Sequence, residues 1–271
     1  MADARNRLRD ANQAAWDLVA AKYAPDVERD VELLRSGGTS LMEPELETLT
    51  PLLRGCGRAI HLQCSHGLDA LSLWRQGARE VVGVDLSERM LAQARRKAGL
   101  LGAPATWHHA DVLAPPPELA GTADLVYTGK GALPWVMDLS TWAGVVARLL
   151  RPGGHFYILE GHPLTWVWAP DAMDLVLRPD ADYFARAARA NDTFPGLFLD
   201  DVANSGGPRA QAWERQWTLG EVVTALATAG LQLVSLHEHA EHFWPQFPHV
   251  PAHRLSRVPH TFSLLMRRPA A

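Results

Sequence analysis

Two acidic residues follow short apolar runs at positions where a nucleoside could bind. Asp85 closes one run, 18 positions after Gly67, and an acid at that spacing is suited to accept hydrogen bonds from both hydroxyls of a ribose. Asp111 follows the next run and is suited to accept the exocyclic amine of an adenine, with Leu86 and Val112 on the two faces of the ring. Each acid also has a simpler explanation, because Asp85 could cap a helix and Asp111 could form a turn.

The loop before Gly67 lacks the glycines that a dinucleotide requires. A pyrophosphate must lie against bare backbone at a helix N-terminus, which is why the dinucleotide fingerprint is rich in glycine. Here Gln63 and Ser65 occupy two of the three glycine positions, and Cys64 between them is expected to be a small packing residue whose backbone lines the site. The pattern favours an adenosine ligand without phosphates, and S-adenosylmethionine (SAM) is the obvious candidate.

Three further residues are placed to assist the transfer of a methyl group. Such a transfer is an in-line displacement at a sulfonium, so alignment does most of the work and a base is needed only where the acceptor must lose a proton. His162 can act as this base near neutral pH, with Glu160 orienting it, and Lys130 can stabilise an anionic acceptor. The simpler alternatives are a histidine in a proline-flanked turn and a solvated lysine at a loop tip.

The elements that position these residues follow from the hydrophobic pattern. Apolar runs alternate with helical patterns from residue 58 to residue 160, which predicts βαβ units around a buried parallel sheet. In such a sheet the ligand lies beyond the carboxyl ends of the strands, where the candidate residues fall. Strands are predicted at 58–63, 81–84, 105–108, 123–128, 155–160, 231–236 and 261–266, and helices at 68–75, 88–98, 139–150 and 219–229.

Two segments outside the sheet are expected to cover the site. Residues 1–53 contain two helical patterns, the first interrupted at Pro25, and predict a lid from which Tyr23 reaches the methionyl end of SAM. Residues 161–212 lose the strand–helix alternation and predict a cap. Aromatic residues in and after this cap could line a pocket for a flat or apolar acceptor, namely Trp166, Trp168, Tyr183, Phe184, Trp213, Trp217, Phe243 and Trp244.

Composition excludes several classes of function. Lys and Arg total 26 against 30 Asp and Glu, a net charge of −4, which disfavours nucleic-acid binding. The two cysteines, Cys56 and Cys64, cannot form a disulfide framework and fit a reducing cytoplasm. The sequence shows no signal peptide and no apolar run long enough to span a membrane. No metal is expected, because no Cys or Asp completes a site with His237, His239, His242, His249 and His253.

The order of these features from Arg58 to Leu159 resembles the class I SAM-dependent methyltransferases. More narrowly, the segments 61–72, 160–163 and 217–226 look like a bacterial subfamily of largely unassigned substrate. The resemblance implies one domain over residues 1–271, with a Rossmann-like, doubly wound α/β sheet of seven strands in the order 3-2-1-4-5-7-6 and the last strand antiparallel. The sequence departs from the family pattern at His61, which replaces the acid that usually opens the first motif.

The resemblance implies a methyltransferase that uses SAM on a small-molecule acceptor, with O-methylation favoured over N-methylation. The Asn/Asp-Pro-Pro-aromatic motif of nucleic-acid amino methyltransferases is absent after the fourth strand. Two alternatives stay open: a non-catalytic SAM-binding module and a nicotinamide-dependent oxidoreductase. The residues expected to bind SAM are Tyr23, Gln63, Cys64, Ser65, Gly67, Asp85, Leu86, Asp111, Val112 and Thr128.

Overall fold

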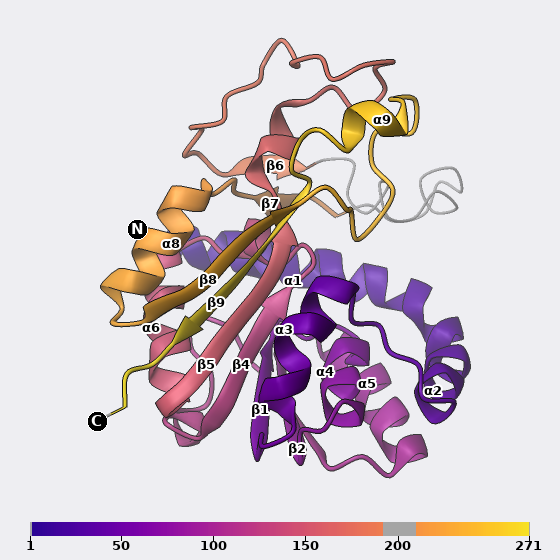
Figure 1. The fold of residues 1–271 in the computed structure, drawn as a ribbon, viewed down its shortest axis with the longest axis vertical. Coiled ribbons are helices and arrows are strands. Elements are labelled where there is room, and N and C mark those ends of the chain that lie inside the picture. The colour runs from indigo at the N-terminus through magenta and orange to yellow at the C-terminus, as the bar shows by residue number, and fades with distance from the viewer. Residues whose placement is uncertain (1, 192–209, 271) are drawn as a thin grey trace.

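A seven-stranded sheet in the order β3-β2-β1-β4-β5-β9-β8 is the centre of the computed structural model, which describes residues 2–191 and 210–270 (Figure 1). Strands β1 to β5 pair in parallel, and β9 is antiparallel to both of its neighbours. The predicted fold class and strand order are therefore confirmed, with β8 and β9 as the sixth and seventh strands of the prediction. The strands are β1 (Arg58–Leu62), β2 (Glu80–Asp85), β3 (Ala105–His109), β4 (Ala123–Gly129), β5 (Leu150–Gly161), β8 (Gln232–His239) and β9 (Thr261–Arg267).

Helices cover both faces of this sheet, and polar caps mark where several of them begin. Ser87 caps α5 by accepting from the backbone N–H of Met90, and Thr218 with Glu221 forms a capping box at the start of α8. The break expected at Pro25 is a short 3-10 turn, Ala24–Asp26. The helices are α1 (Ala2–Tyr23), α2 (Val27–Arg35), α3 (Glu43–Leu53), α4 (Leu68–Arg75), α5 (Glu88–Leu101), α6 (Leu139–Leu149), α8 (Leu219–Thr228) and α9 (Ala252–Leu255).

The sheet separates two apolar cores. Phe156 and Tyr157 are consecutive residues of β5, and they enter opposite cores because strand side chains alternate between the two faces. Trp142 of α6 packs edge-on against Phe156 at a centroid distance of 5.6 Å on one face, and Leu49 of α3 is buried on the other. With both faces covered, the edge at the carboxyl ends of the parallel strands is the place left for a ligand.

The N-terminal helix is joined to the mid-chain addition. The buried side chain of Asn12 donates from Nδ2 to the carbonyl oxygen of Trp213 at 2.9 Å and accepts at Oδ1 from the N–H of Trp213 at 2.7 Å. Trp213 belongs to β7 (Ala212–Glu214), which pairs with β6 (Arg189–Asn191) in a separate two-stranded sheet. Part of the predicted cap, residues 192–209, lies outside the described residues. Within the described chain, no helix has the length and apolar character to cross a membrane.

We predict that the substitution Asn12→Ala lowers the free energy of unfolding by about 2 kcal/mol, because two hydrogen bonds at roughly 1 kcal/mol each are lost in a buried place. Urea denaturation measures this difference. Gln13→Ala is the matched control, because Gln13 is the next residue of α1 and its side chain makes an exposed contact with His109. Equal losses in the two variants would contradict the proposed tie between α1 and β7.

Candidate functional site

A cavity of about 680 Å³ opens at the carboxyl ends of β1, β2 and β4. The loops after these strands form one wall, a face of α1 forms another, and Phe243 and Trp244 complete it from the segment between β8 and β9. Nine of the predicted site residues line it: Tyr23, Gln63, Cys64, Ser65, Asp85, Leu86, Asp111, Val112 and Lys130. Gly67, Thr128, Glu160 and His162 are not among its lining residues.

Asp85 lies at the end of β2 and holds two loops together. Its Oδ2 accepts from the N–H of Ser65 at 2.7 Å, and its Oδ1 accepts from the N–H of Ser87 at 2.8 Å. Each oxygen keeps a lone pair for a further donor. Burial raises the pKa of Asp85 to about 6, although the N–H groups of Ser87 and Ser65 act in the opposite direction. The carboxylate is therefore ionised at neutral pH and able to accept two hydroxyl groups.

The first loop keeps a left-handed backbone without the glycines that would favour it. Gln63 has φ 57° and Ser65 has φ 49°, conformations that cost non-glycine residues free energy. Gln63 also donates from Nε2 to the carbonyl oxygen of Ala132 at 2.8 Å, which joins this loop to the loop after β4. At Gly67, with φ 81°, a Cβ would lie 2.6 Å from that of Ala94, so glycine permits close packing against α5.

Asp111, Leu86 and Val112 line the same end of the cavity as Asp85. Oδ1 of Asp111 accepts from the N–H of Leu113 at 2.9 Å, which is the turn contact considered above as the simpler explanation. That contact engages one carboxylate oxygen, and Oδ2 has no hydrogen-bond partner among the described residues. The turn and the adenine role are therefore compatible, and the adenine role stays a prediction.

Lys130 belongs to a buried charge cluster at the cavity. Its Nζ lies 3.0 Å from the carboxylate of Glu45 and 3.1 Å from that of Asp69, and it donates to the carbonyl oxygen of Ser40 at 2.9 Å. Tyr127 donates to Glu45 at 2.5 Å. Burial would lower the pKa of Lys130, but the two carboxylates raise it. The lysine is neither solvated nor free for an acceptor anion, since its charge is already matched within the protein.

Glu160 shapes the loop after β4. Its fully engaged carboxylate accepts from the backbone N–H groups of Gly131 at 2.6 Å, Ala132 at 2.7 Å, Leu133 at 2.9 Å and Gly161 at 2.7 Å. Burial raises its pKa, and these four donors oppose the shift. The geometry does not support the expected role of Glu160 in orienting His162, because both of its oxygens accept hydrogen bonds from the main chain.

His162 is held by other partners. Its Nδ1 accepts from the N–H of Leu164 at 3.1 Å, and its Nε2 lies 2.8 Å from the carboxylate of Glu238 in β8. Burial lowers its pKa, against the opposing charge of Glu238. With both nitrogens engaged and the ring outside the cavity lining, the structure does not support the expected role of His162 as a base. Thr128 is likewise structural, because its hydroxyl donates to the carbonyl oxygen of Leu62 at 3.0 Å.

Several lining residues escaped the sequence analysis or received no role there. Trp16 and Trp135 pack edge-on at 5.2 Å and form part of the cavity wall. Asp69 and His61 line it beside Lys130, and the Nδ1 atom of His61 is buried without a hydrogen-bond partner. Burial lowers the pKa of His61 to about 4, so the ring is neutral. Of the aromatic residues expected at the pocket, only Phe243 and Trp244 line this cavity.

Comparison with known proteins relates the chain to methyltransferases. Residues 59–154 match the family model described as a methyltransferase domain. A segment of 100 residues is 33% identical to the ubiquinone biosynthesis O-methyltransferase of Aromatoleum aromaticum, and the match covers 37% of this chain and 42% of that protein. The match thus spans less than half the length of this curated relative.

Two solved structures resemble the chain over most of its length. A SAM-dependent methyltransferase from Mesorhizobium loti is 25% identical, with a TM-score of 0.61 over 83% of this chain and 96% of that one. A structure from Listeria monocytogenes, described as of the same class, is 20% identical, with a TM-score of 0.61 over 83% of this chain and 97% of that one. The latter likeness supports the fold alone.

We predict that Glu160→Gln lowers the free energy of unfolding by about 2–3 kcal/mol, because the amide NH₂ would face backbone donors that now bind a charged acceptor. Thermal and urea denaturation provide the measurement. The control is Glu238→Gln, which removes the charge from the half-exposed carboxylate that faces Nε2 of His162, and a loss below about 1 kcal/mol is expected. If Glu160→Gln were the milder of the two changes, the assigned role of Glu160 would be incorrect.

Proposed function

Because the chain belongs to the class I SAM-dependent methyltransferases, we propose that it transfers the methyl group of SAM to a small-molecule acceptor in the cytoplasm. The observation that carries this proposal is the continuity of one cavity. Asp85 and Asp111 line the same cavity as Trp16, Trp135 and Trp244, which contribute an aromatic wall. A nucleoside and an apolar acceptor can therefore bind next to each other in one cavity.

The charges and polar atoms of the cavity fit SAM. When bound, SAM supplies a methyl group activated by a sulfonium. The carboxylates of Asp85, Asp111 and Asp69 line the cavity and favour a cationic ligand. Oε1 of Gln63 and Nδ1 of His61 are buried without protein partners, and buried polar atoms of this kind are normally satisfied. We assign Asp85 to the ribose, and Leu86, Val112 and Asp111 to the adenine.

The acceptor is proposed to be aromatic or apolar. Trp16 and Trp135 offer ring edges and faces, and Phe243 packs against Trp244 at 4.4 Å. Such walls bind flat molecules through large contact areas. Oxygen is favoured as the methylated atom over nitrogen, and the name of the relative from Aromatoleum aromaticum, an O-methyltransferase, agrees with this preference.

Positioning is proposed to be the main source of catalysis. His162 and Glu160 are engaged elsewhere, and the charge of Lys130 is matched by Glu45 and Asp69. An in-line displacement gains most from holding the two reacting atoms in register, which can supply several kcal/mol of barrier reduction. The preferred acceptor is accordingly one whose attacking atom is nucleophilic at neutral pH without a base, such as an acidic phenol.

Calorimetric titration with SAM, S-adenosylhomocysteine and NADH separates the three functions considered. Methyl transfer predicts binding of the first two and formation of S-adenosylhomocysteine with members of a panel of phenols and aromatic amines. A SAM-binding module predicts the same binding without turnover, and an oxidoreductase predicts binding of NADH. Absence of SAM binding would refute the proposal.

We predict that Asp85 makes SAM binding depend on pH. The hydroxyls need the ionised carboxylate, and its pKa in the ligand-free protein is about 6. Affinity should be constant near pH 7 and fall by up to about tenfold per pH unit below pH 6, the limit for one linked proton. Asp85→Asn should bind more weakly with a flatter profile. Calorimetric titrations of both proteins with SAM between pH 5 and 7 measure this dependence. A wild-type affinity that does not change with pH would contradict the assignment of Asp85 to the ribose.

The same shift has a consequence for folding. The folded pKa of Asp85, about 6, exceeds the usual value of 3.8, so its contribution to stability is fully present below the unfolded pKa and is lost as pH rises through about 6. The ionised group that binds the ribose therefore opposes folding of the ligand-free protein at neutral pH.

We predict that His162→Ala leaves kcat within about threefold of wild type while it lowers thermal stability, because His162 acts as a link to β8 and not as a base. A general base would give a loss of about 10²–10⁴ in kcat at unchanged SAM affinity. Steady-state kinetics with the best acceptor from the panel distinguish the two roles. A loss of about 10²–10⁴ in kcat would show that His162 acts as the base after all.

A further inference from the structure

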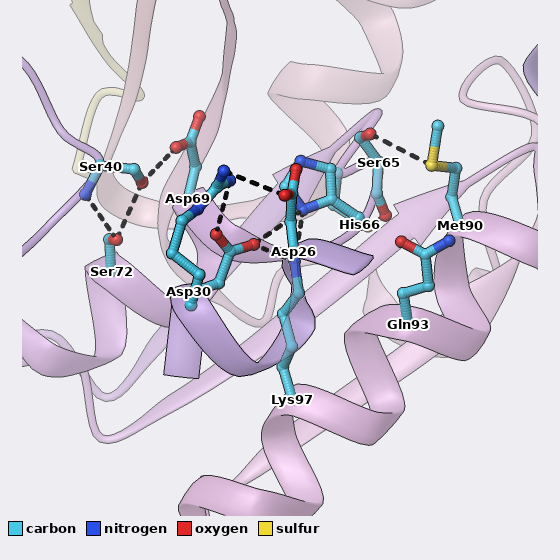
Figure 2. A network of polar contacts seen from close by, with 12 residues as sticks. Asp26, Asp30, Ser40, Ser65, His66, Asp69, Ser72, Met90, Gln93 and Lys97 are labelled. Atoms are coloured by element: carbon cyan, nitrogen blue, oxygen red, sulfur yellow. Dashed lines mark hydrogen bonds and ion pairs between the residues drawn. The ribbon is translucent and has the colours of Figure 1, made fainter. Parts of the chain in front are cut away.

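His66 in the first loop is bound to a buried ion pair that joins two helices (Figure 2). Nζ of Lys97, in α5, lies 2.6 Å from Oδ2 of Asp30, in α2, and both side chains are buried. The same Nζ lies 2.5 Å from Nδ1 of His66. Because an ammonium group has donors and no acceptor, the contact requires a lone pair on Nδ1.

This requirement determines the position of the proton on a neutral ring. With Nδ1 accepting, the proton of His66 must be on Nε2. Burial, and then the charge of Lys97, lower the pKa of His66 to about 4, so the ring is neutral over the physiological range. Nε2 has no hydrogen-bond partner among the described residues, and His66 lines the cavity. The side chain is therefore a fixed donor next to the ligand.

The geometry points to Lys97 and Asp30 as positioning residues that hold His66 as its Nε2–H tautomer, for donation to the carboxylate of the amino-acid part of SAM. This inference rests on the proposed function. In SAM the carboxylate is the anionic acceptor, whereas the ribose hydroxyls and the adenine amine are assigned to acids. The ring face of His66 is covered by Tyr23 of α1, stacked at 4.4 Å, which keeps the ring in one orientation.

Other charged groups near His66 do not change this assignment. Arg29 of α2 pairs with Asp26 at 2.9 Å and with Asp30 at 3.3 Å. The groups facing His66 from the surrounding elements are Tyr23 from α1, Arg29 and Asp30 from α2, His61 from β1, Asp69 from α4 and Lys97 from α5, with Asp26 beyond Arg29. Among the residues that the structure describes, only Lys97 contacts Nδ1 at hydrogen-bond distance, since Oδ2 of Asp30 lies 3.7 Å from that nitrogen.

Lys97→Met is the informative variant. Without the ammonium, Asp30 becomes the charged neighbour of Nδ1 and favours a proton there. At low pH the His66 ring of the variant is then protonated on both nitrogens, and Nε2 still donates. At higher pH the ring is neutral and keeps its proton on Nδ1, so Nε2 presents a lone pair to the ligand carboxylate. We divide the association constant of the variant for S-adenosylhomocysteine by that of wild type at each pH. This ratio should fall at least tenfold from pH 6 to pH 9. A purely structural role of Lys97 predicts a ratio that does not change with pH.

Two controls limit the interpretation. Arg96→Met removes the exposed ion pair of Arg96 with Glu28, which also joins α5 to α2, and should give a ratio near one at every pH. 5′-Methylthioadenosine retains the nucleoside but lacks the amino-acid carboxylate, so its ratio for Lys97→Met should not depend on pH. A pH-dependent ratio with this ligand would overturn the assignment to the carboxylate.

A measurement on the wild-type protein covers the case in which Lys97→Met does not fold. Long-range ¹H–¹⁵N NMR spectra at pH 7, assigned with a His66→Gln variant, should show a neutral ring protonated on Nε2. Protonation on Nδ1, or a charged ring, would overturn the inference. If wild type fails to bind S-adenosylhomocysteine, the proposed function fails instead; if it binds and the Lys97→Met ratio is flat, only the role of the ion pair is refuted.

Discussion

Buried carboxylates that accept backbone N–H groups determine the shape of the ligand edge of the sheet. A carboxylate removed from water needs a cation or several donors, and here the main chain supplies the donors. Asp85 binds the N–H groups of Ser65 and Ser87, and Glu160 binds four N–H groups, three of them in the loop after β4. The conformation of each loop therefore depends on the strand end that carries the acid. The register of the sheet thus positions the loops that surround the cavity.

The sequence predicted the sheet well because burial on both faces leaves a strong pattern of short apolar runs. Asp85 was accessible to the same reasoning, since the spacing from Gly67 follows from one strand–helix–strand unit. The backbone of the first loop was not accessible. Gln63 and Ser65 retain left-handed conformations at 57° and 49°, so the loop keeps a shape that glycine would favour. A pyrophosphate is therefore disfavoured at this loop by the bulk of the Gln63 and Ser65 side chains, and not by a different backbone conformation.

Position along the chain was a poor guide to the contacts of Lys130, Glu160 and His162. Glu160 and His162 lie at the carboxyl end of β5, as predicted, but the direction of each side chain is decided by partners distant in sequence. His162 meets Glu238 of β8, and Lys130 meets Glu45 of α3. A single sequence contains no local signal for such pairs. Glu45 in particular resembles any acidic residue near the start of a helix, where acids are common.

The acidic and the aromatic parts of the cavity lining come from different elements. Strand ends supply the acids, whereas the aromatic wall comes from α1, from Trp135 and from the segment that carries Trp244. The two parts are nevertheless joined, because Ser87, two residues after Asp85, donates from its hydroxyl to Asp17 of α1 at 2.5 Å. The same helix is bonded to β7 through Asn12. Changes in α1 would therefore affect both parts of the lining, since this helix contributes to the aromatic wall and supports the loop next to Asp85, the acid proposed to bind the ribose.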